Sequence, residues 1–234
     1  MGAESGGAPG EGPPPATGRD GAVERVAHEI EHGAARWPAA VATLLIGVAY
    51  ALVSARLRVG PPWLLFAIVA LANVPLTIAV LRGRHDLARP AALALLTLIT
   101  LAVIASAALL AIRLPSKGVA APELLRDAAL LWVSNVLTFA LWYWEIDTGG
   151  PGKRRRHHVS TDFVFPQMTA GGRHTRAWSP GFVDYLFLAF NTSTAFSPTD
   201  TMVLSRRAKV LMMTQSLVSL LVIGVLVARA INTL

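Results

Sequence analysis

Hydroxyl side chains and one carboxylate gather at the end of a short apolar run near the C-terminus. The run begins at Asp184 as DYLFLAF and leads directly into NTSTAFSPTD, which ends at Asp200. At membrane depth, a polar group without a hydrogen-bond partner costs several kcal/mol. These oxygens therefore need protein partners or water beside them: Asn191, Thr192, Ser193, Thr194, Ser197, Thr199 and Asp200.

The length of this segment restricts how it can be placed. Residues 184–200 are too apolar for a surface loop, but a helix that crosses a bilayer needs about 20 apolar residues to span a core of about 30 Å. Irregular backbone survives at membrane depth only inside protein or beside water. The segment therefore predicts a re-entrant, half-buried element.

Composition assigns the whole chain to the membrane. Of its 234 residues, 53% are hydrophobic and 15% are charged, and the mean hydropathy is +0.51. The absence of cysteine excludes disulfides, thiolate metal sites and a cysteine nucleophile. The formal charge of +7 comes with arginines beside apolar segments, which favours contact with anionic lipid and not with nucleic acid.

Five apolar runs have the length of membrane-spanning helices. We expect an all-α integral membrane protein with about five transmembrane helices and a re-entrant half-helix, or alternatively six crossings. Short connections between the first four runs favour antiparallel neighbours in one bundle. The runs are Trp37–Ala55, Trp63–Leu81, Ala91–Ile112, Ala128–Trp144 and Val210–Val227.

The rest of the chain divides by composition. Residues 1–21 are rich in Gly and Pro and predict a disordered tail, and residues 22–36 have the periodicity of an interfacial amphipathic helix. A three-helix transmembrane region follows over residues 37–127. After the fourth run, residues 145–180 form a long polar loop that contains the extended-looking DFVFPQM.

Polar residues inside the apolar runs are few and uncharged. No Asp, Glu, Lys, Arg or His lies within the five runs, which argues against a proton pump or an arginine-based voltage sensor. We expect the uncharged polar side chains to hydrogen-bond across helices, for about 0.6–2 kcal/mol each. They are Asn73, Asn135, Thr138 and Gln215.

Patterns typical of enzymes and metal sites are missing. No nucleophile elbow or glycine-rich phosphate loop occurs, so we expect neither an enzyme nor a cofactor. His28 and His32, and the loop histidines His157, His158 and His174, lack a full metal-binding motif, and we expect no bound metal. The densest basic run predicts contact with lipid headgroups: Lys153, Arg154, Arg155 and Arg156.

The order of segments after Asp184 resembles the pore domain of potassium channels. In that family an aromatic-rich pore helix leads through a Thr-x-Thr-Thr step into a TVGYGD filter, and a short loop leads to the inner helix. Thr192 and Thr194 match the threonines, and Asp200 matches the closing aspartate without a gap. The likeness covers an outer helix at 128–144, the polar loop at 145–180, a pore helix and filter-like loop at 181–200, and an inner helix at 206–234.

The filter-like loop departs from the family at its glycines. Phe196, Ser197, Pro198 and Thr199 stand where the family carries Val, Gly, Tyr and Gly. The family's glycines adopt backbone angles that aim successive carbonyls at a dehydrated ion, and Ser or Thr adopts these angles only with strain. We therefore expect no standard potassium filter.

The resemblance nevertheless implies a homotetramer that passes monovalent cations with weak selectivity. Phe196 would form an apolar constriction, and Asp200 a carboxylate ring at the mouth. The alternative is a non-conducting structural or lipid-interacting membrane protein. The filter-like residues of the first hypothesis are Thr192, Ser193, Thr194, Phe196, Ser197, Thr199 and Asp200.

The wider chain is also similar to an uncharacterised family of bacterial multi-pass membrane proteins, through DYLFLAF and LSRRAKVLMMTQSL. This resemblance implies the bacterial cytoplasmic membrane but no established activity. The orientation stays open. A channel-like arrangement puts more basic charge outside than the positive-inside rule favours, so the topology is inverted, residues 180–198 cross as a sixth helix, or the rule fails here.

Overall fold

The computed structural model describes residues 37–82, 85–113, 121–147, 150, 162–169, 179–194 and 200–231. Within these ranges the chain is helical apart from short loops and one pair of two-residue strands, so the all-α prediction is confirmed at that level. The elements are α2 (Trp37–Leu52), α3 (Pro62–Leu81), α4 (His85–Arg113), α5 (Ala121–Ile146), β1 (Phe163–Val164), α7 (Pro166–Thr169), α8 (Phe182–Thr194), β2 (Met202–Val203) and α9 (Arg206–Ile231).

Four of the described helices, α3, α4, α5 and α9, are long and apolar enough to cross a membrane. Helix α2 is apolar but has 16 residues, which corresponds to about 24 Å at 1.5 Å per residue. Helices α4, α5 and α9 extend beyond the predicted apolar runs into charged residues at their ends. The prediction of a multi-pass membrane protein is consistent with these lengths.

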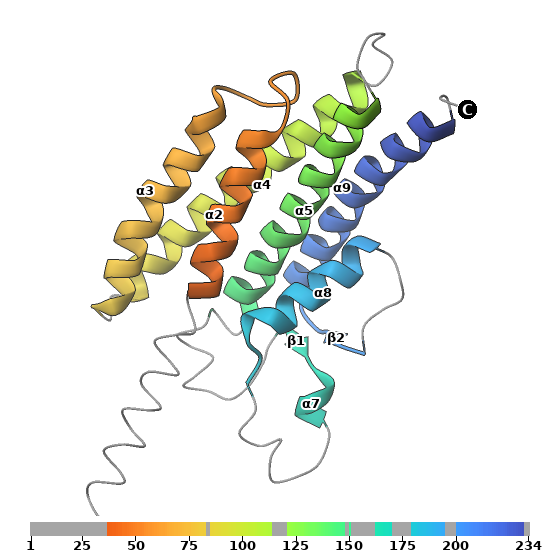
Figure 1. Cartoon of the computed structure of the whole chain (residues 1–234). Coiled ribbons are helices and arrows are strands. Elements are labelled where there is room, and N and C mark those ends of the chain that lie inside the picture. The colour runs from red at the N-terminus through yellow and green to blue at the C-terminus, as the bar shows by residue number, and fades with distance from the viewer. Residues whose placement is uncertain are drawn as a thin grey trace, which may run out of the picture. The chain divides into compact units, whose positions relative to one another are not determined.

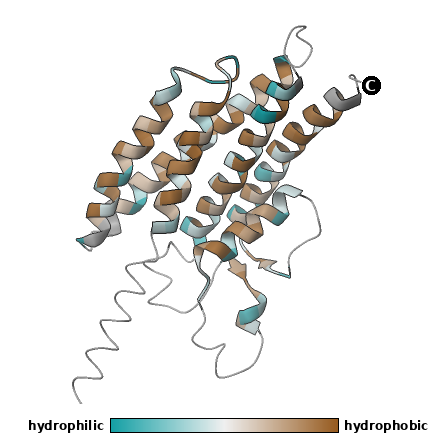
Figure 2. Cartoon of the chain, in the orientation of Figure 1, coloured by the Kyte–Doolittle hydropathy of each residue, from teal (hydrophilic) through white to brown (hydrophobic). Residues whose placement is uncertain are grey.

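Helix α5 lies at the centre of the bundle (Figure 1). It packs against α2, α4, α8 and α9, while α3 packs against α2 and α4. Buried apolar side chains recur along α5 at helical spacing, as in Ala128, Leu131 and Phe139. Apolar residues cover much of the helix surfaces, and hydrophilic colour appears mainly near helix ends and in the connections (Figure 2).

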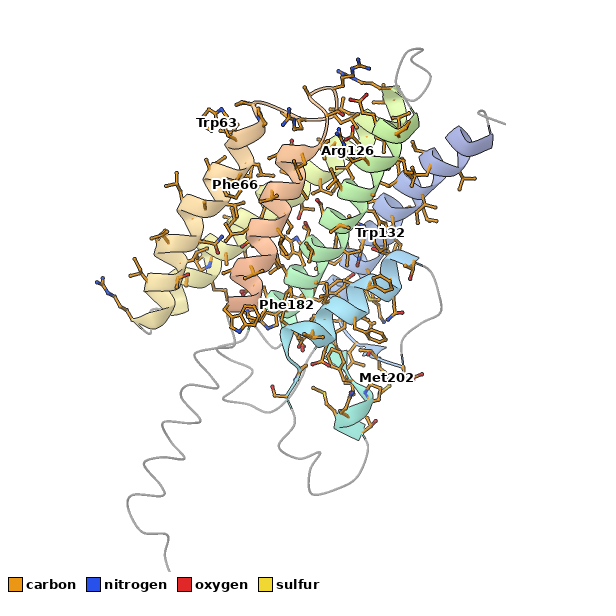
Figure 3. All side chains as sticks on the ribbon, viewed as in Figure 1. Trp63, Phe66, Arg126, Trp132, Phe182 and Met202 are labelled. Carbon is orange, nitrogen blue, oxygen red and sulfur yellow. The ribbon has the colours of Figure 1, made fainter. Side chains whose placement is uncertain are left out.

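The two ends of the bundle carry different groups of residues (Figure 3). Trp63 and Arg126 lie at one end, and Phe182 and Met202 lie toward the other. Antiparallel pairing of β1 with β2 places Phe163 opposite Val203 beside the end of α5 and the start of α9. We call this end, defined by Ile146, β1, β2 and Arg206, the ribbon end.

Local capping explains where α8 and α9 begin. The Asp184 carboxylate accepts a hydrogen bond of 2.7 Å from the Gly181 amide, as an acidic residue in the first turn of a helix does. The Ser205 hydroxyl accepts a hydrogen bond of 3.2 Å from the Ala208 amide, which satisfies one of the free N–H groups of the first turn of α9. Both starts are therefore encoded next to the helices themselves.

Cross-helix hydrogen bonding is confirmed for three of the four predicted residues. The Asn73 amide of α3 donates to the Thr43 hydroxyl of α2 at 3.0 Å. Asn135 and Gln215 join α5, α8 and α9, as described below. The prediction is wrong for Thr138, because its hydroxyl donates to Ser134 O of its own helix at 2.6 Å. A buried hydroxyl in a helix is readily satisfied by the carbonyl one turn earlier.

Candidate functional site

Helix α8 is short and reaches only part of the way along the bundle. It has 13 residues and lies obliquely beside α5 and α9 (Figure 1). Its last turn is level with Gln215, whose side-chain amide donates to Ser193 Oγ at 2.8 Å. Gln215 is nine residues from the start of α9, which corresponds to about 14 Å along that helix. Helix α8 therefore ends deep among the longer helices.

The chain on both sides of α8 lies at the ribbon end. At the start of α8, Phe182 packs edge-on against Trp144 in the last turn of α5. After α8, strand β2 pairs with β1, and the Leu204 amide donates to Asp162 O at 2.9 Å. The start of α8 and strand β2 therefore lie at the same end of the bundle.

Two buried aspartates fix the start of α8 to the end of α5. The Tyr185 hydroxyl donates to the Asp147 carboxylate at 2.5 Å, and the Asp162 amide donates to the same carboxylate at 3.2 Å. Tyr185, Asp147 and Asp162 are each fully buried. A buried carboxylate is tolerable only when hydrogen bonds replace its lost hydration. Asp147 is therefore the point at which three segments meet.

Arg207 joins α9 to the same cluster. Its guanidinium donates to both Asp162 carboxylate oxygens, at 2.6 and 2.5 Å, and to Ile146 O at 3.1 Å. This two-pronged pairing matches the planar guanidinium to the planar carboxylate. We call Asp147, Asp162, Tyr185 and Arg207 the ribbon-end clamp. The clamp connects the end of α5, the start of α8 and the start of α9.

A second, uncharged cluster holds the other end of α8. The fully buried Gln215 side chain donates to Ala189 O at 2.7 Å and to Ser193 Oγ of α8, and it accepts a hydrogen bond from the Tyr143 hydroxyl of α5. Three helices therefore converge on one amide. We call Gln215, Tyr143 and Ser193 the amide hub. Together with the ribbon-end clamp, it fixes the tilt and the rotation of α8.

Aromatic contacts complete the inner face of α8, whereas its outer face is open. Tyr185 packs edge-on against Phe163 and Phe165, with ring centroids 6.2 and 5.3 Å apart. On the other face, Val183 and Phe187 are mostly exposed. These two residues lie four apart, on one side of the helix. One side of α8 thus packs against β1 and the residue that follows it, and the opposite side is exposed.

The structure separates the predicted filter-like residues into different environments. The hydroxyls of Thr192 and Thr194 donate to carbonyls of their own helix, at 2.8 Å to Leu188 O and 3.1 Å to Phe190 O. Ser193 is buried in the amide hub, and Asp200 is exposed beside β2. Thr192 to Thr194 thus share the last turn of α8, whereas Asp200 lies just before β2.

Other predictions lie outside the described residues. These are the tail at 1–21, the interfacial helix at 22–36, the five histidines considered as metal ligands (His28, His32, His157, His158 and His174), the remaining filter-like residues Phe196, Ser197 and Thr199, and the basic run Lys153, Arg154, Arg155 and Arg156.

The ribbon-end clamp was not predicted from the sequence. Its carboxylates lie just outside the apolar runs, where a charged residue normally signals solvent. One signal was available: Asp147 directly follows the end of α5, and Asp162 directly precedes β1 as the first residue of DFVFPQM. An acidic residue next to an apolar helix end, with an arginine at the start of another helix, is a possible buried pair.

In comparisons with known proteins, no family model, no curated protein and no solved structure matches this chain.

Proposed function

We propose that residues 121–231 form a channel-like module of a multi-pass membrane protein, through which monovalent cations pass with weak selectivity. The observation that carries this proposal is the course of α8. A 13-residue helix enters from the ribbon end, stops level with Gln215, and its chain returns to the same end. That course favours re-entry over a sixth crossing.

The depth of α8 gives the proposal its electrostatic basis. Half of a hydrocarbon core is about 15 Å, so the last turn of α8 would lie near the middle of the bilayer. The C-terminal end of a helix carries a partial charge of about −0.5. A water-filled path past Thr194 would therefore favour cations. Weak selectivity follows from the missing filter glycines.

The proposed assembly is a homotetramer in a bacterial cytoplasmic membrane. One copy supplies one re-entrant helix, so an ion path surrounded on all sides needs several copies around an axis. The apolar face of α8 that carries Val183 and Phe187 is exposed and so available to a second copy. The outer helix of the module is α5 and the inner helix is α9, in the order that the potassium-channel likeness implies.

Recording from purified protein in planar bilayers tests conduction. We expect cation-preferring currents, and we expect Asp200→Asn to lower the cation-to-anion permeability ratio about two- to threefold, because a charge near a narrow mouth concentrates counter-ions. Glu123→Gln, at the opposite end of the bundle, is the matched control and should leave the ratio unchanged. Folded tetramers that carry no current under any ion gradient would refute conduction.

Cysteine labelling tests re-entry separately, because the chain contains no cysteine. Ser179→Cys and Thr201→Cys bracket α8, and Val59→Cys lies in the loop at the opposite end. We expect an impermeant thiol reagent applied to intact cells to label both or neither of Ser179→Cys and Thr201→Cys. Val59→Cys should give the opposite result. Labelling of Ser179→Cys and Thr201→Cys from opposite sides would mean that the segment crosses.

A lipid-interacting, non-conducting protein is the second candidate. The exposed basic residues at the ribbon end favour it, among them Arg82, Arg206 and Lys209. Such residues attract anionic headgroups by about 1 kcal/mol each. In this case bilayers give no current, while binding to vesicles that contain phosphatidylglycerol falls when Arg206 and Lys209 are changed to Gln.

A further inference from the structure

Two buried polar atoms in the interior of the bundle lack hydrogen-bond partners. Asn135 of α5 is fully buried, and its Nδ2 donates to Ser219 Oγ at 2.8 Å and to Gln215 O at 3.3 Å. In the part of the chain that the structure describes, nothing donates to Asn135 Oδ1. Ser106 of α4 is also fully buried, and its Oγ has no partner within the same ranges.

The register of α4 against α5 puts Ser106 and Asn135 at similar heights along the bundle. Trp142 Nε1 of α5 donates to Thr100 Oγ1 of α4 at 2.8 Å, and consecutive helices joined at one end run antiparallel. From this anchor, Ser106 is about 9 Å along α4 and Asn135 about 10 Å along α5, in the same direction. Both side chains belong to buried faces of packed helices.

The neighbouring donors Ser134, Thr138 and Gln215 are engaged with other acceptors. The hydroxyls of Ser134 and Thr138 donate to carbonyls of α5, at 2.8 and 2.6 Å. The amide of Gln215 is held by Ala189 O and Ser193 Oγ. An acceptor left unpaired in a buried site keeps the full penalty of its lost hydration. The site therefore requires a small ligand that donates hydrogen bonds.

We propose that Asn135 Oδ1 and Ser106 Oγ bind one water molecule that bridges α4 to α5. A water-mediated bond is nearly as favourable as a direct one, and buried waters typically satisfy polar atoms that the protein leaves unpaired. The oxygens at this site are uncharged, and the buried carboxylates Asp127 and Glu145 lie near the two ends of α5. That chemistry favours neutral water over a cation. The site does not depend on conduction.

Replacing Ser106 by Ala distinguishes a hydroxyl that binds a bridging water from a hydroxyl that has no partner. If water bridges the two side chains, Ser106→Ala lowers Tm by about 2–4 °C. If the hydroxyl is unpaired, its removal leaves Tm unchanged or raises it, because an unsatisfied polar group disappears. The latter result would overturn the proposal. Ser134→Ala, which removes a hydroxyl bonded within its own helix, is the matched control and should change Tm less.

A double-mutant cycle tests whether the two residues act together. Ser106→Ala and Asn135→Leu are combined, and the structure shows no direct hydrogen bond between the two side chains. With a bridging water, the loss in the double variant is smaller than the sum of the single losses. Additive losses contradict the proposal.

Radiolytic hydroxyl-radical labelling reports the water directly. The fully buried Leu131 lies one turn from Asn135, so a bound water would cause its oxidation. We expect this oxidation in the unmodified protein and not in Ser106→Ala. Absence of labelling in the unmodified protein would refute the site. Thermal unfolding in sodium, potassium and choline chloride at equal ionic strength tests whether the ligand is a metal cation instead of water. A Tm increase specific to one metal cation, lost in Ser106→Ala, would identify that cation and overturn the assignment to water.

Discussion

Helices α2 and α3 meet through close packing, whereas α5, α8 and α9 meet through a network of hydrogen bonds. At Gly47 of α2 the backbone of α3 approaches so closely that an added Cβ would lie 3.2 Å from Phe66 Cα. Thr43 and Asn73 supply the cross-helix hydrogen bond of this pair. In contrast, the single side chain of Gln215 in α9 hydrogen-bonds to both α8 and α5.

The difference follows from helix length. Helix α3 has 20 residues and is long and apolar enough to cross a membrane, so the bilayer itself restricts its position. Helix α8 has 13 residues, which is short for a helix that is stable by itself in water and below the about 20 residues of a typical membrane-spanning helix, so its position has to be specified by its partners. Hydrogen bonds are directional, and they fix rotation and depth where an apolar face alone would allow sliding.

The largest expected effect is from removing the amide hub. Gln215→Leu leaves Ala189 O, Ser193 Oγ and the Tyr143 hydroxyl without their partner, so we expect a loss of about 2–5 kcal/mol in the free energy of unfolding. Thr214→Val is the matched control, because the Thr214 hydroxyl bonds within α9. Tryptophan fluorescence during denaturation in detergent measures both. Equal stability of the two variants would show that the hub does not place α8.

Breaking the ribbon-end clamp should have an intermediate effect. Asp162→Asn weakens the paired contacts with Arg207, and we expect a loss of about 1–2 kcal/mol, since the Arg207 side chain is 53% exposed and partly screened by solvent. Asp200→Asn, an exposed carboxylate in the same region, serves as control. Amide exchange at Leu204, which bonds to Asp162 O, should accelerate. Unchanged exchange at Leu204 would show that the pairing of Asp162 with Arg207 does not stabilise the contact between β1 and β2.

The smallest effect is expected in the packed pair. Asn73→Leu removes the bond to Thr43 but keeps the volume at the α2–α3 interface, and we expect a loss of about 1 kcal/mol or less. Thr97→Val is the control, because the Thr97 hydroxyl bonds within α4. The same unfolding assay applies. A loss as large as that of Gln215→Leu would mean that hydrogen bonds do not distinguish the two regions.

Much of the fold was accessible from the amino-acid pattern. Apolar runs located the long helices, and their uninterrupted length assigned the chain to the membrane class. The uncharged polar residues Asn73, Asn135 and Gln215 were recognisable as cross-helix partners, because a polar side chain in hydrocarbon needs one. Thr138 was misassigned, since a threonine hydroxyl has a carbonyl of its own helix within reach.

The sequence by itself determined that residues 184–200 are too short to cross and too apolar to lie outside, because hydropathy and length are local properties. Only the tertiary structure decided that Ser193 accepts a hydrogen bond from Gln215 of the same chain, and that Asp147 and Asp162 are buried. Arg207 lies 45 residues from Asp162 along the chain. Whether two such charges meet depends on how the helices between them pack, and this long-range geometry leaves no periodic pattern in the sequence.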